Sequence, residues 1–151
     1  MASSNAVVVR ARPEDAALVA PLFDAYRTFY GEPPDADLAR EFLHERLVRE
    51  ESVVFVALEG PASIGFAQLY PSFSSVSARR QWILNDLFVA PEARGRGIGA
   101  TLLETTRQFA VETGAKRLVL ATALDNLPAQ RLYESLGWKR EEAFRHYYLD
   151  V

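Results

Sequence analysis

The sequence contains no cysteine, and this absence excludes disulfide bonds, thiolate metal sites and cysteine nucleophiles. Only two histidines are present, too few to assemble a zinc site. The formal net charge is −3 at pH 7, which indicates no basic face for nucleic acid. The longest apolar run is VVFVAL, and the N-terminus shows no basic-then-apolar signal segment. We therefore expect no metal, no nucleic-acid partner, no membrane association and a cytoplasmic location.

Apolar residues, by contrast, are plentiful: they make up 49% of the 151 residues, enough for one buried core. The chain has no internal repeat, and the serine-rich stretch from Pro71 to Arg80 is too short for an interdomain linker. Its arginine pair, Arg79 and Arg80, is expected in a solvated loop. We predict a single domain over residues 1–151.

Stretches typical of strands and helices follow one another in the order βααβββαβαβ. The first helix closes on Gly31, and the second has Leu38, Leu43 and Leu47 at helical spacing. The strands that we expect are AVVVRA, SVVFVALEGPASIGFAQLYPSF with a turn at EGPAS, RQWILNDLFVA, KRLVLATA, and a final strand or hairpin in WKREEAFRHYYLDV. This order predicts an α/β or α+β fold in which helices flank a mixed sheet.

The stretch APEARGRGIGATLL places three glycines at alternate positions before a helix-like run. Unpaired amide N–H groups at a helix N-terminus, with the helix dipole, bind phosphate. Arg94 and Arg96 add charge, while Gly97 and Gly99 allow a diphosphate to approach the backbone. No lysine follows the glycines as in a P-loop, and the strand lies too far away for a dinucleotide fingerprint. The pattern favours a phosphate-binding loop of another kind.

Two motifs here resemble those of the GNAT superfamily of acetyl-coenzyme A dependent N-acetyltransferases. The pattern [QR]xxGx[GA] stands as Arg94-Gly95-Arg96-Gly97-Ile98-Gly99. The pattern Nxx[AS]xxxY stands as Asn126, Ala129 and Tyr133, followed by LGW. The resemblance covers residues 82–138 closely. It implies a splayed, mostly antiparallel mixed sheet, acetyl-coenzyme A as cosubstrate between ILNDLFV and RLVLATA, a small-molecule amine as acceptor, and a homodimer.

The resemblance also implies residue roles. Main-chain groups of Phe88 and Val89, with Asn126, would hold the pantetheine arm, and Tyr133 would protonate the leaving thiolate. A phenol of pKa about 10 and a thiol of about 8.5 are close enough for this proton transfer. Asn126 also suits a plain helix N-cap, and Tyr133 also suits core packing. The full cofactor-binding set is Phe88, Val89, Arg94, Gly95, Arg96, Gly97, Ile98, Gly99, Ala100, Asn126, Ala129 and Tyr133.

The acceptor amine must lose a proton, because only about one part in a thousand of a primary amine is neutral at pH 7. Relatives often carry a glutamate where this chain has Asn85, which cannot act as a base. Strand alternation is expected to send Asp86 to the face opposite Asn85, beside Leu84 and Phe88. Asp86 could then be the base, an anchor for a cationic acceptor or a structural carboxylate, and a water chain held by Asn85 is the competing account.

The acceptor pocket is expected to draw on aromatic and acidic side chains that suit a cationic amine, with Tyr26, Tyr30, Glu32 and Tyr147 as candidates. The leading hypothesis is direct acetyl transfer to a small amine in a ternary complex. The alternatives are a protein acetyltransferase acting on lysine or an N-terminus, and a module that binds coenzyme A without catalysis.

Overall fold

The computed structural model of the protein describes residues 5–151. The chain divides into two compact units, one extending to Leu120 and one from Ala121 to Val151. Each unit is described by itself below.

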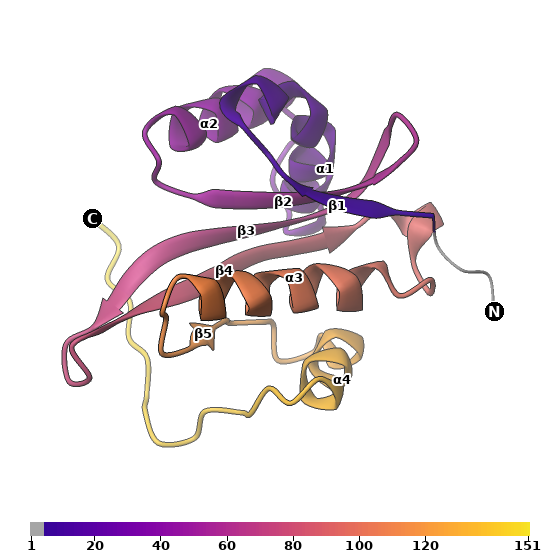
Figure 1. Cartoon of the computed structure of the whole chain (residues 1–151). Coiled ribbons are helices and arrows are strands. Elements are labelled where there is room, and N and C mark those ends of the chain that lie inside the picture. Colours follow the sequence, from indigo (N-terminus) through magenta and orange to yellow (C-terminus); the bar gives the residue numbers. More distant parts are fainter. Residues whose placement is uncertain (1–4) are drawn as a thin grey trace. The chain divides into compact units, whose positions relative to one another are not determined.

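Of the elements found in residues 5–151, the first unit contains every strand and the helices α1, α2 and α3 (Figure 1). Its elements are β1 (Val7–Arg10), α1 (Ala16–Phe29), α2 (Ala36–Val48), β2 (Val53–Glu59), β3 (Ala62–Ser74), β4 (Arg79–Val89), α3 (Ile98–Glu112) and β5 (Leu118–Val119). Short 3-10 turns at Pro13–Asp15 and Pro91–Ala93 precede α1 and the glycine loop. The order predicted from the sequence is confirmed over this part of the chain.

The five strands form one sheet in the order β1-β2-β3-β4-β5. The first three ladders are antiparallel, and β4 pairs with β5 in parallel. This last ladder joins only Trp82 to Leu118 and Ile83 to Val119, so β5 is much shorter than the predicted KRLVLATA strand. Among the described residues, no residue of β4 after Ile83 pairs with β5. The two strands therefore separate along the second half of β4, which is the feature expected of a splayed sheet.

Helices cover both faces of the sheet (Figure 1), and aromatic contacts identify which helix covers which face. Phe55 of β2 and Trp82 of β4 both lie against Phe109 of α3, with ring centroids 5.6 and 5.0 Å apart. On the other face, Phe66 of β3 meets Phe23 of α1 edge-on at 6.1 Å. The core is therefore a three-layer arrangement, with α1 and α2 on one side and α3 on the other.

Two details of the first unit differ from the sequence interpretation. Leu43 and Leu47 of α2 are buried as predicted, but Leu38 is 46% exposed, and Ala39 takes the buried position in the first turn. Arg79 and Arg80 both lie in β4 and not in a loop, and the Arg80 guanidinium covers the rings of Phe73 and Trp82. The serine-rich stretch therefore closes a hairpin.

The second unit consists of α4 (Leu127–Ser135) and the extended chain that follows it. Asn126 caps this helix, because its side chain accepts a hydrogen bond from the Ala129 amide at 3.4 Å. Residues 139–151 contain no strand, so the strand or hairpin predicted there is wrong. Strand propensity alone does not suffice, since a strand forms only where a neighbour satisfies its backbone groups.

Candidate active site

The glycine loop joins β4 to α3 and exposes a row of backbone amides. Gly95 and Gly97 have φ angles of +76° and +80°, which side-chain-bearing residues rarely adopt. A Cβ atom at either position would meet nothing within 4 Å, so the backbone conformation and not crowding requires glycine. The first helical bond runs from the Thr101 amide to the Gly97 carbonyl, and residues 98–100 therefore have no helical acceptor for their amides. The loop has the form of an anion-binding nest.

A close helix-to-strand contact fixes the position of this loop. A Cβ atom at Gly65 of β3 would lie 3.2 Å from both the Leu102 side chain and the Phe88 carbonyl, and 3.3 Å from the Ile98 side chain. A side chain here would require these neighbours to shift by a few tenths of an ångström, so glycine favours the close approach of α3 to the sheet. The amides at the start of α3 are thereby held beside the end of β4.

Both arginines of the loop contact protein groups. Arg94 donates from Nε to the Val89 carbonyl at 2.9 Å, and its guanidinium lies over the Phe88 ring. Arg96 forms an ion pair with Glu59, the last residue of β2. The loop motif alone predicts both charges at a diphosphate and gives no indication of Glu59.

A β-bulge interrupts β4 at Asn85. Gln68 of β3 lies opposite Asp86, while the next residue, Leu69, lies opposite Leu84, so Asn85 has no partner across the ladder. Because the extra residue resets the alternation, Trp82 faces α3 whereas Phe88 faces Tyr26 of α1.

Because of the bulge, Asp86 has a different orientation from the one that the sequence predicts. Regular alternation would place Asp86 on one face with Leu84 and opposite Asn85. Instead, Asp86 shares a face with Phe88 and turns away from Leu84, and its Oδ1 accepts a hydrogen bond from Asn85 Nδ2 at 2.9 Å. The side chains of Asn85 and Asp86 are therefore neighbours.

Asp86 is a buried carboxylic acid, with only 3% of its surface exposed. Gln68 Nε2 donates to its Oδ2 at 2.5 Å, and Tyr26 also lies within hydrogen-bonding reach. Burial raises the pKa of Asp86 above its ordinary value, and the hydrogen bonds from Gln68, Asn85 and Tyr26 act against that rise. The carboxylate form of Asp86 is therefore a stronger base than an exposed aspartate.

Sequence reasoning missed the two β3 residues beside this acid. Gln68 is fully buried, and its Oε1 has no hydrogen-bond partner among the described residues. Burial raises the pKa of Tyr70 to about 12, with a further increase from the Asp86 charge and an opposing effect of Arg46. The one sequence signal at Gln68 is its polar side chain within the otherwise apolar stretch GFAQLY.

The aromatic candidates for the acceptor pocket separate into two groups. Tyr26 donates its hydroxyl to the Asn85 carbonyl at 3.2 Å, and its ring lies 5.0 Å from that of Tyr30. Tyr30 is half exposed, and Glu32, just after α1, is 3.8 Å from Arg27. These residues gather near the bulge on one side of the sheet. Tyr147 belongs to the second unit, where it is exposed.

The second motif lies entirely in the second unit. Asn126, Ala129 and Tyr133 follow helical spacing along one side of α4. The Tyr133 ring lies 5.9 Å from that of Trp138, whose amide donates to the Tyr133 carbonyl at 3.0 Å. The LGW sequence therefore ends α4, and its tryptophan packs against Tyr133.

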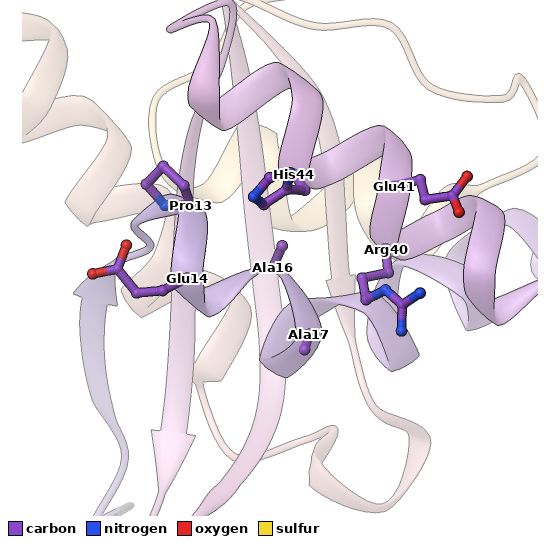
Figure 2. A pocket seen from close by; sticks show the side chains of 7 residues that line it. All are labelled: Pro13, Glu14, Ala16, Ala17, Arg40, Glu41 and His44. Atoms are coloured by element: carbon purple, nitrogen blue, oxygen red, sulfur yellow. The ribbon is translucent and has the colours of Figure 1, made fainter.

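A separate hollow of about 320 Å³ lies between the start of α1 and α2 (Figure 2). Its charged lining is already paired in part, since Arg40 lies 3.5 Å from Asp37 and Glu14 lies 3.3 Å from Arg12. His44 lines the same hollow and is exposed. None of the residues predicted to take part in acetyl transfer lines it.

The loop, the bulge and the splayed sheet define the class of protein, which comparison with known proteins makes explicit. The model of the acetyltransferase (GNAT) family matches residues 19–138. An uncharacterized N-acetyltransferase of Bacillus subtilis (strain 168), YhfO, is 48% identical over 94% of this chain and 95% of its own length. The thialysine N-epsilon-acetyltransferase of Bos taurus is 35% identical over 52% of this chain and 46% of its own. A crystal structure of a probable acetyltransferase superposes with a TM-score of 0.91, at 45% identity, over 96% of this chain and 97% of that one.

The protein is therefore an acyltransferase. It belongs to the GNAT family, whose members use acetyl-coenzyme A as cosubstrate. Within residues 5–151, no group of three or more histidine, aspartate or glutamate side chains could hold a metal ion. A search of the same residues for membrane-spanning helices finds none of sufficient length and apolar character.

Proposed function

We propose that this protein transfers acetyl from acetyl-coenzyme A directly to the primary amine of a small molecule, in a ternary complex. The observation that carries the proposal is the buried carboxylic acid Asp86 at the β4 bulge, on the sheet that also delivers the glycine loop. The name of the Bos taurus relative supports a small amine as acceptor.

The chain's own groups suit the cosubstrate. The amides from Arg94 through Ala100 would bind the diphosphate, because positive φ at Gly95 and Gly97 turns successive N–H groups toward one point. Main-chain groups of Phe88 and Val89 would hold the pantetheine arm, together with Asn126 and Ala129 from the second unit. The two units would then act as one N-acetyltransferase domain.

Asp86 would take the proton from the acceptor amine. Its raised pKa brings a carboxylate closer to the operating pH, where a general base is most effective. The neutral amine then attacks the thioester carbonyl, a C–N bond forms, the C–S bond breaks, and the nitrogen releases its second proton to solvent as the amide forms. A water chain held by Asn85 would be the alternative route for the proton.

Tyr133 would return a proton to the departing thiolate, and solvent would then restore the phenol. Tyr26, Tyr30 and Glu32 would line the acceptor site, with Tyr147 as a further candidate. We also propose that the protein is a homodimer and that its location is cytoplasmic. Light scattering on the purified protein tests the first of these, and fractionation of cells that express it tests the second.

The decisive experiment measures initial rates of thiol release from acetyl-coenzyme A over polyamines, amino acids, aminoglycosides and lysine peptides. Turnover is expected with one class of small amine, and Tyr133→Phe should lower it by about 10²-fold. Faster turnover on lysine peptides would favour the protein acetyltransferase. Binding of coenzyme A without turnover on any amine would favour a non-catalytic module.

A further inference from the structure

The ion pair between Glu59 and Arg96 places an internal anion beside the phosphate-binding loop. Glu59 ends β2, and Arg96 stands between the two positive-φ glycines of the loop, 37 residues further along the chain. Their side chains are 39% and 32% exposed, so solvent and solutes reach both partners. The pair is therefore an accessible contact and not part of the core.

The other loop arginine has a different kind of partner. Arg94 donates to a neutral carbonyl, that of Val89, and keeps its full positive charge for a ligand. Arg96 has its charge balanced by a carboxylate. A phosphate that approaches the amides of residues 95–100 would compete with that carboxylate for the guanidinium.

The end of β2 holds Glu59 in this position. Glu59 pairs across the hairpin with Ala62, and the β2–β3 register shifts between Ala57 and Leu58, directly before it. The β2–β3 ladder therefore holds the Glu59 backbone, from which the carboxylate reaches Arg96.

We propose that Glu59 competes intramolecularly with the phosphate groups of coenzyme A for Arg96, and so limits the affinity of the loop for coenzyme A. The proposal rests on the assignment of the loop to coenzyme A under the proposed function. An enzyme that must release coenzyme A after each turnover gains from such a limit, since tight product binding slows kcat. A purely positioning role for Glu59 would have the opposite sign, because its loss would then weaken binding.

Calorimetric titration of coenzyme A into Glu59→Gln tests the proposal. Freed from its partner, Arg96 should bind phosphate more strongly, and the dissociation constant should fall by about three- to fivefold at low salt. The matched control is Glu104→Gln, which removes the same charge from an arginine pair on α3, that with Arg107. Its dissociation constant should remain within about twofold of the wild-type value.

A double-mutant cycle tests whether Glu59 changes the affinity for coenzyme A through Arg96. In an Arg96→Gln background, Glu59→Gln should change the dissociation constant by less than about twofold, since no guanidinium remains to be released. Glu59→Ala, which removes the same charge, serves as the second variant, and thermal melting verifies that each variant folds.

The outcomes separate the two proposals. Failure of the wild-type protein to bind coenzyme A would overturn the proposed function and the role of Glu59 together. Intact wild-type binding, with weaker or unchanged affinity in the Glu59 variants, would overturn the competition alone. An equal gain of affinity in the Arg96→Gln background would also overturn it, because the effect would then be general repulsion.

Discussion

The glycine loop and the β4 bulge are the two regions of the first unit to which we assign roles in catalysis. The two regions use different chemical groups of the protein. The loop works through backbone amides, and the glycines within residues 94–100 give it the positive φ angles that turn those amides outward. The bulge site works through side chains that come from α1, β3 and β4, with Tyr26 and Asn85 separated by 59 residues. A local motif therefore supplies the proposed binding of the cosubstrate, whereas tertiary structure supplies the proposed proton chemistry.

Asp86→Asn gives the sharpest test of this separation. We expect kcat/KM to fall by about 10²- to 10⁴-fold, the range of general base catalysis, while calorimetry shows the wild-type affinity for coenzyme A. Asp37→Asn, at an exposed position in α2, is the matched control and should keep full activity. An unchanged pH–rate profile in Asp86→Asn would eliminate Asp86 as the base and would favour the water chain at Asn85.

Gly97→Ala tests the loop half of the comparison. A side chain at φ +80° strains the backbone by about 1–2 kcal/mol, and the displaced amides should weaken coenzyme A binding by about tenfold. Gly114→Ala is the control, since Gly114 has a φ of +73° after α3 with no atom within 4 Å of its Cβ position. Both variants should lose similar thermal stability, and only Gly97→Ala should lose affinity. Equal affinity in the two variants would contradict the loop assignment.

The pH dependence of unfolding tests the burial of Asp86 without any substrate. Because its folded pKa is raised, the native state binds more protons than the unfolded state between the ordinary and the raised pKa. This contribution to stability is complete below the ordinary pKa and is lost as the pH rises through the raised one. The slope reaches at most about 1.4 kcal/mol per pH unit. Urea unfolding of Asp86→Asn across the same range should lack it, and an identical slope would show that other groups are responsible.

The smallest of the expected effects is a change in the pKa of Tyr70. Its pKa of about 12 should appear as a late step in the ultraviolet absorbance titration of the phenols, and Tyr70→Phe should remove that step. Since Asp86 adds to the rise, Asp86→Asn should move the step to lower pH. No movement would indicate that burial alone sets the Tyr70 pKa.

Much of the fold followed from local signals. A positive-φ glycine ended the first helix where the sequence placed it, at Gly31, and Asn126 capped α4 as predicted. The errors came where long-range pairing decides the outcome: a bulge reset the alternation at Asn85, and residues 139–151 formed no strand. No local pattern distinguishes a bulged strand from a regular one when the apolar residues continue through it.

The sequence by itself determined the family, through two motifs in order, and the backbone form of the glycine loop, because φ values near +80° strongly favour glycine. Tertiary structure decided which side chains share a face with Asp86 and which anion holds Arg96. Gln68 and Glu59 carry no motif, and their importance arises from the strand register that brings them to Asp86 and Arg96. Register depends on hydrogen bonds between distant segments, and those bonds exist only in the folded chain.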